Sequence, residues 1–204
     1  MATNWPSSVQ TFTNPTSGSS LSSPSHADQH ATVNDTVEAL QQYAGLVFIK
    51  SVTVGSGVTS VTVSNAFDSR FDFYQISVTN VTNSANQPSF RLTLGAGGSQ
   101  HKTVGMYIGL GTSTITGYNL GPGTSFIIAD MCAPSAASSY DVTIKNPYNA
   151  VRTTMSAQNC STNWGSWYNG IEDANTSHTS FTLFPNTGTL TGGVIRVYGY
   201  NNGA

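Results

Sequence analysis

Large side chains along this chain recur with two different periods. Between His26 and Val47 the period alternates between four and three residues, through His26, His30, Val33, Val37, Leu40, Ala44 and Val47. That spacing is the a/d pattern of a coiled-coil heptad. From Leu46 onward Val, Ile and Phe alternate with Ser and Thr, a period of two that predicts half-buried strands. The pattern therefore predicts one helix followed by a long β-rich segment.

The helix is expected from about His26 to Ala44. Ser25 can cap its first turn, and Asp28 stands three residues later, as in a capping box. Polar residues flank a narrow apolar stripe, which suits an identical helix better than a broad core. We expect the helix to join subunits through five seam residues, namely His30, Val33, Val37, Leu40 and Ala44. The alternative is an amphipathic helix that lies on the β-rich domain of its own chain.

The β-rich segment predicts about ten short strands. Besides the Val-rich runs that begin at Val52, Val58 and Ile76, we expect strands at Phe90–Leu94, Val104–Leu110, Ser125–Ala129, Tyr140–Lys145, Arg152–Ala157, His178–Phe184 and Val194–Tyr200. Gly, Asn and Pro separate nearly all of them, and no strand-helix-strand alternation is present. The predicted fold class is mainly β, an antiparallel β-sandwich of jelly-roll type.

Three regions follow from these patterns: an extended arm over 1–24, a helix over 25–45 and a β-sandwich domain over 46–204. The arm is rich in Ser and Thr, and Pro6 and Pro15 interrupt it. Its large apolar residues, Trp5, Val9 and Phe12, are too few to fold alone, so we expect them to dock onto a partner surface.

The composition of the chain indicates which classes of partner and which cellular compartment to expect. Charged residues make up 8% of the chain and the net charge is −2, so phosphate binding has little support and nucleic acid is not expected as a partner. No signal peptide and no apolar run long enough for a membrane span are readable, which predicts synthesis in a cytoplasm. In that reducing compartment Cys132 and Cys160 are expected as free, buried thiols, with a disulfide as the alternative.

Several segments resemble a family of known proteins. The run from Pro24 to Leu40 (PSHADQHATVNDTVEAL) resembles a segment near the start of phage tail-fibre, minor structural and head-decoration proteins. The ending Phe181–Tyr200, with Phe73–Asn80 and Ser89–Leu94, is similar to the sandwich domain of such proteins. The resemblance implies a structural component of a bacteriophage virion, made in the host bacterial cytoplasm. It also implies a trimer that docks onto other virion proteins, either as a tail fibre or as a head-decoration or capsid-fibre protein.

Catalysis is not expected. Glycoside hydrolysis needs two carboxylates at a set separation, whereas the chain has nine acids in all; Asp130, Asp141, Glu172 and Asp173 are those in its second half. No Gly-x-Ser-x-Gly or phosphate-binding loop is present. His26 and His30 have the spacing of two metal ligands, but no third ligand is near in sequence. We therefore expect no enzyme activity, no cofactor and no metal.

An aromatic segment is the best candidate ligand site. Asn163–Asn169 (NWGSWYN) places Trp164, Trp167 and Tyr168 between predicted strands, flanked by the amides of Asn163 and Asn169. Exposed rings flanked by amides could stack on sugars of host glycans. The alternative is that these rings fill the core or a subunit interface. A free carbohydrate-binding module is a further alternative for the whole chain.

Overall fold

The computed structural model describes residues 25–43, 45–86, 88–95, 98, 100–129, 136–161 and 164–200. The chain divides after Val47 into two units, which are treated separately. The described elements, in chain order, are α1 (His26–Tyr43), β1 (Leu46–Thr53), β2 (Val61–Val63), β3 (Phe73–Asn83), β4 (Phe90–Leu94), β5 (His101–Gly109), β6 (Ile115–Gly123), β7 (Phe126–Ala129), β8 (Ser138–Lys145), β9 (Thr153–Cys160), β10 (Trp164–Glu172), β11 (Phe181–Pro185), β12 (Leu190–Thr191) and β13 (Val194–Tyr200).

The helix α1 begins where the capping residues predict. The backbone amide of Asp28 donates to the Ser25 hydroxyl at 3.4 Å, and the Gln29 amide donates to the Ser25 carbonyl at 3.0 Å. The first bond satisfies one of the amide groups that lack partners in a first turn, and the second is the first regular bond of the helix. Thr32 and Thr36 direct their hydroxyls back to the carbonyls four residues earlier, at 2.8 Å each.

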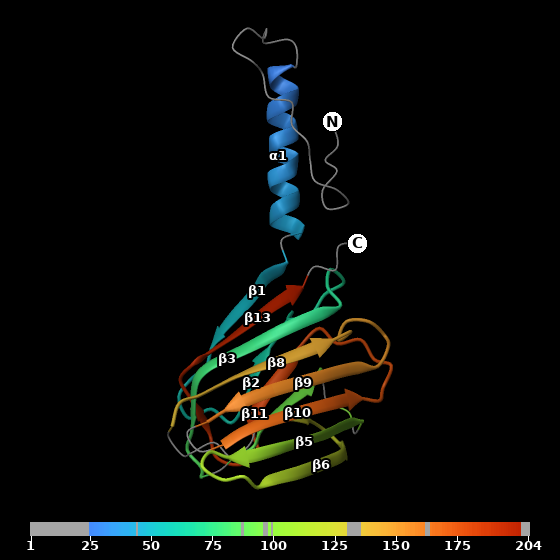
Figure 1. Cartoon of the computed structure of the whole chain (residues 1–204). Coiled ribbons are helices and arrows are strands. Elements are labelled where there is room, and N and C mark those ends of the chain that lie inside the picture. Colours follow the sequence, from blue (N-terminus) through green and yellow to red (C-terminus); the bar gives the residue numbers. More distant parts are fainter. Residues whose placement is uncertain are drawn as a thin grey trace. The chain divides into compact units, whose positions relative to one another are not determined.

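The second unit is a β-sandwich with jelly-roll topology (Figure 1). The larger sheet has the order β1-β13-β3-β8-β9-β10-β5-β6, with β12 beside β3, and the smaller sheet has the order β2-β11-β4-β7. The first four strands of the roll pair in turn with the last four in reverse: β1 with β13, β2 with β11, β3 with β8 and β4 with β7. A chain folded double and then wound around a barrel gives this pairing, which is the jelly roll. The predicted mainly-β sandwich preceded by a helix is confirmed.

Two hairpins are inserted into the roll, and both extend the larger sheet. Strands β5 and β6 come between β4 and β7, whereas β9 and β10 come between β8 and β11. The hairpins meet through an antiparallel β5–β10 pair, with Met106 opposite Trp167 and His101 opposite Glu172. The larger sheet is thereby widened beyond the four-stranded sheet that packs against it.

The core lies between the two sheets and is built from alternate residues of each strand. Strand β8 runs buried-exposed-buried along its length, and β9 does the same. The largest fully buried side chains are Tyr74, Tyr168, Phe67, Phe90, Phe126, Phe181, Ile76, Leu92, Leu94, Ile127, Ile128 and Ile144. This alternation follows from the period of two in the sequence.

Three features of the sequence interpretation need correction. Ile115–Gly123 and Trp164–Glu172 were expected to be connections, but they form β6 and β10. Both strands are rich in Gly and Asn and carry few Val or Ile residues, so their strand character comes from pairing with neighbours. A strand was expected to begin at His178, but residues 178–180 precede β11, which begins at Phe181.

Along the described part of the chain, no helix has the length and hydropathy needed to cross a membrane.

Candidate functional site

The outer face of the larger sheet carries the candidate site. Strand β10 alternates between its two faces, so that Trp167 and Asn169 are exposed while Ser166 and Tyr168 are buried. Pairing with the neighbours places Trp167 opposite Gln158 of β9 and Gln158 opposite Asp141 of β8. Asp141 in turn lies opposite Ser77 of β3. One row across four strands therefore presents an aromatic ring, an amide, a carboxylate and a hydroxyl on the same face.

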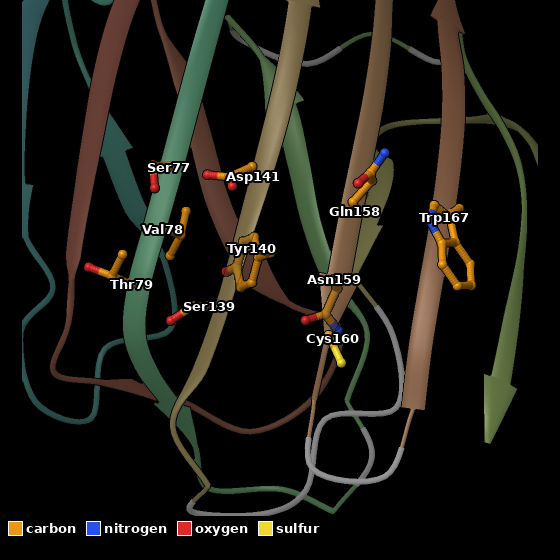
Figure 2. A pocket seen from close by; sticks show the side chains of 10 residues that line it. All are labelled: Ser77, Val78, Thr79, Ser139, Tyr140, Asp141, Gln158, Asn159, Cys160 and Trp167. Atoms are coloured by element: carbon orange, nitrogen blue, oxygen red, sulfur yellow. The ribbon is translucent and has the colours of Figure 1, made fainter. Parts of the chain in front are cut away.

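A shallow hollow of about 350 Å³ follows this row (Figure 2). Residues of β3, β8, β9 and β10 line it: Ser77, Val78, Thr79, Ser139, Tyr140, Asp141, Gln158, Asn159, Cys160 and Trp167. Most of the side chains that line it carry hydroxyl or amide groups, and Asp141 carries the one carboxylate among these lining residues. A hollow with such a lining suits a ligand that offers many hydroxyl groups.

Trp167 provides the apolar surface of the site. Its side chain is 42% exposed, an unusual degree for so large an aromatic residue. A Cβ atom on Gly165 would lie 3.3 Å from the indole, so the glycine leaves the space in which the ring rests against its own strand. The ring is therefore positioned by local packing and still offers a free face for stacking.

Internal hydrogen bonds hold two of the hydroxyl groups beside the hollow. Arg196 Nη1 donates to Thr79 Oγ1 at 3.2 Å, and the Asn80 backbone amide donates to Ser139 Oγ at 3.2 Å. These hydroxyls keep fixed positions before any ligand arrives. Pre-ordered polar groups reduce the entropy lost on binding.

Apolar residues border Trp167 on the side of the inserted β5–β6 hairpin. Met106, opposite Trp167, is 43% exposed, Val104 is 55% exposed and Ile115 of β6 is 60% exposed. Their side chains extend the apolar surface of the indole toward the edge of the sheet. Such a surface fits the predicted stacking site and equally the alternative, an interface between subunits.

The structure divides the predicted aromatic site into an exposed and a buried part. Tyr168 is 1% exposed and meets Tyr118 edge to face at 6.3 Å, so its ring belongs to the interior and not to a ligand site. Trp164 is half-buried against Tyr107, with ring centroids 5.5 Å apart. Asn163 lies outside the described residues. Because the segment is a strand, adjacent residues point to opposite faces, and only Trp167 and Asn169 of the predicted set lie exposed on the outer face.

Sequence analysis missed Gln158 and Ser77 as members of this site, and it named Asp141 only as one of the few acids in the second half of the chain. The alternation along each strand could have placed these side chains on an outward face. Their proximity depends on the register between four strands, and neither periodicity nor spacing in one chain fixes that register.

A second cluster of titratable groups lies inside the sandwich. His178 Nε2 and Glu172 Oε2 are 2.6 Å apart, and their side chains are 7% and 2% exposed. His101 is fully buried, and its Nδ1 lies 3.0 Å from the Gly98 carbonyl. Burial lowers the pKa of His101, although the Gly98 carbonyl and the Glu172 carboxylate oppose that shift. The cluster has no exposed surface, so we assign it to packing and not to ligand binding.

A surface ion-pair group adjoins this cluster. Asp173 accepts from Lys102 Nζ at 2.7 Å and pairs with Arg152 Nε at 2.8 Å. The hydrogen bond from Lys102 and the charge of Arg152 lower the pKa of the Asp173 carboxyl. Two of the acids considered for catalysis, Glu172 and Asp173, therefore both serve as partners of basic groups.

The predicted oligomerisation residues form an exposed stripe on α1. Val33 is 46% exposed, Val37 45% and Leu40 43%, while His26 and His30 precede them on the helix. The Nε2 atoms of His26 and His30 are 3.1 Å apart. Ala44 lies outside the described residues, as do the predicted docking residues Trp5, Val9 and Phe12. Cys160 is a free thiol but is exposed, so the expectation that it is buried was wrong; Cys132 is also outside the described part.

Comparisons with known proteins add little. No family model matches the chain, and no curated protein matches it. Among solved structures, the chain is similar to a protein of unknown function from Shewanella oneidensis MR-1. That match has 13% sequence identity, covers 79% of this chain and 78% of the other, and has a TM-score of 0.25. A likeness this distant carries no functional argument.

Proposed function

We propose that this chain is a non-enzymatic structural protein of a bacteriophage particle, which self-associates through α1 and presents its jelly-roll domain outward. The observation that carries the proposal is the exposed stripe of Val33, Val37 and Leu40, each more than two-fifths exposed in the single chain. These three large apolar residues lie at heptad spacing along one side of the helix, and their exposure to water is unfavourable for an isolated helix. A second and third copy of the same helix would cover them.

A trimer is the form that we propose. Val at two seam positions with Leu at the third is compatible with two or three strands, so the number three comes from the resemblance to phage fibre proteins. The arm over 1–24, with Trp5, Val9 and Phe12, would attach the trimer to another virion protein. The virion is accordingly the proposed location, after synthesis in the bacterial cytoplasm.

For the β-domain we propose contact with host glycans through the outer face of the larger sheet. Trp167 supplies a face on which the apolar side of a sugar ring can stack, while Gln158 and Asp141 lie in the same row to bond its hydroxyl groups. With a single carboxylate among the residues lining this hollow, it lacks the pair that glycosidic bond cleavage uses. Binding without hydrolysis is therefore the activity that these groups support.

Two alternatives remain close to this proposal. A head-decoration or capsid-fibre protein would use the same helix and sandwich to stabilise or ornament the capsid. A free carbohydrate-binding module would use the same sheet face, and the exposed Trp167 is the observation that favours it.

The test combines solution mass with location on the particle. Light scattering of the full chain should give three times the 21.4 kDa of one chain. Antibodies against the β-domain, viewed by electron microscopy on purified particles, should label the tail. Labelling of the capsid would favour the decoration protein, and a monomer that labels no particle would favour the free module.

A further inference from the structure

Two imidazole rings on α1 lie close together on adjacent helical turns and form a hydrogen bond with each other. His26 and His30 lie one helical turn apart, and their Nε2 atoms approach to 3.1 Å. The ring centroids are 4.4 Å apart and the planes meet at 84°. Both side chains are exposed, so the two nitrogen atoms are accessible from solvent.

The separation of these nitrogens matches the geometry of a metal site. Zinc binds imidazole nitrogen at about 2.0–2.1 Å, so two ligands at an angle between a right angle and the tetrahedral angle lie about 2.9–3.4 Å apart. The observed 3.1 Å falls within this interval, and a bound ion would replace the hydrogen bond that now joins the two nitrogens. Neutral imidazole is a preferred ligand of Zn²⁺, Ni²⁺ and Cu²⁺.

One chain supplies too few ligands. Among the described residues, no three His, Cys, Asp or Glu side chains come together to hold a metal ion. His26 and His30 occupy the d and a positions of the heptad that continues through Val33, Val37 and Leu40. If the helices associate along that stripe, the same two imidazoles of every copy face the common axis.

We propose that His26 and His30, together with the equivalent imidazoles of the partner copies, bind one divalent transition-metal ion on the axis of the helical bundle. This inference rests on the proposed association of α1. Three copies would offer six nitrogens, an octahedral set suited to Ni²⁺ or Zn²⁺, and two copies would offer a tetrahedral set of four.

The charge balance near the site is compatible with a cation. The positive end of the helix dipole opposes a cation in the first turn. The carboxylate of Asp28 lies in that same turn and offsets the opposition. Because imidazole must be neutral to bind a metal, acid should release the ion.

The experiment measures metal uptake and oligomer mass on the same full-length protein. After treatment with EDTA, the chain is dialysed against NiCl₂ or ZnCl₂ at pH 7.5, and bound metal per chain is determined by elemental analysis. We expect one ion per oligomer, thus one per three chains for a trimer. His26→Ala and His30→Ala should each weaken the binding by about tenfold or more, because one ligand of each pair is lost.

A matched control and the mass separate this inference from the proposed function. Glu38→Ala changes an exposed polar residue at the outward b position of the same heptad pattern and should leave uptake unchanged. An oligomer that binds no metal, or binds as well in the double His variant, overturns the metal site and leaves the association of α1 standing. One ion per chain overturns the shared site, since a single helix then suffices. A monomer in both EDTA and metal overturns both proposals.

Discussion

Glu172 and His178 form a buried hydrogen-bonded pair, with His178 Nε2 and Glu172 Oε2 2.6 Å apart. Both side chains are less than one-tenth exposed. His101 lies opposite Glu172 in the β5–β10 register, so three titratable groups from β5, β10 and the segment before β11 come together. The sequence alone did not predict this cluster, because 77 positions separate His101 from His178.

This cluster predicts that acid destabilises the β-domain. Burial holds the pKa of His101 below its ordinary value of 6.5. The unfolded chain therefore takes up a proton at a higher pH than the folded chain does. The contribution of His101 to stability is complete above about pH 6.5 and is lost as the pH falls below that value. Urea unfolding between pH 7.5 and 5 should show a decreasing free energy of unfolding.

A variant pair isolates the source of this dependence. His101→Phe keeps an aromatic ring against Phe126, whose centroid is 4.5 Å from that of His101, and removes the titrating group. The free energy of unfolding should then change less steeply with pH. Val151→Ala removes no titrating group and should keep the full slope. An equally steep slope in His101→Phe would contradict this account.

Replacing Trp167 by alanine should separate binding from folding. The indole is 42% exposed, so its loss should cost about 1–2 kcal/mol of stability, less than the 3–5 kcal/mol typical of a fully buried Trp. Binding to host cells or to a glycan array should be lost. Val151→Ala removes a side chain of similar exposure, 46%, outside the hollow, and should bind normally.

The same substitution tests the alternative role of the ring. If Trp167→Ala lowers the oligomer mass and leaves glycan binding intact, the indole belongs to a subunit interface. Loss of about 3–5 kcal/mol would instead place the ring in a well-packed environment.

The glycine beneath the indole provides a subtler test. In Gly165→Ala the new Cβ would lie 3.3 Å from Trp167, close enough to push the ring from its position. Glycan affinity should fall although every binding group is still present. Gly117→Ala, on β6 of the same sheet, meets no atom within 4 Å and is the matched control. Equal affinity in both variants would show that the ring's position does not matter.

Leu40→Asp should dissociate the oligomer without unfolding the β-domain. A charge buried in a helix seam costs several kcal/mol unless it is paired. Light scattering should report a monomer, while thermal unfolding of the β-domain should stay near that of the natural chain. Ala31→Asp adds the same charge at the exposed, outward b position and should remain oligomeric. Simultaneous loss of assembly and of folding would place the helix in the core of its own domain.

Deletion of residues 2–20 should leave a folded oligomer that no longer enters the particle. The arm has few large apolar residues, too few to contribute a core of its own, so its ordering depends on a partner surface. Purified particles from a complementation experiment should lack the truncated chain. Normal incorporation would mean that another segment makes the attachment.

How far the sequence predicted this structure depends on the element. Ser25 and Asp28 located the start of α1, and Phe90–Leu94 and Val194–Tyr200 match β4 and β13. These segments show their period and caps locally. Trp164–Glu172 was read as a connection because it contains Gly and Asn, yet pairing on both sides with β9 and β5 makes it a strand.

The candidate site shows the same division between local and distant information. Trp167 was found from the local sequence, since Trp164, Trp167 and Tyr168 lie within five consecutive residues. Tyr168, one residue later, was assigned to the same site, although alternation along a strand directs it into the core. Gln158 and Asp141 became neighbours of Trp167 only through the register of β8, β9 and β10.

The two inserted hairpins and the eight strands of the roll differ in how freely their exposed residues can be substituted. The four roll pairs close without β5, β6, β9 or β10, so the shell does not depend on the connections within either hairpin. Gln158 and Trp167, by contrast, lie on the β9–β10 hairpin, and Met106 lies on the β5–β6 hairpin. If this face binds host glycans as proposed, substitutions on these four strands would change the ligand that it binds, whereas the pairing of the roll strands would be preserved. A lineage that adapts to a changed host surface would then accumulate its differences on these four strands first.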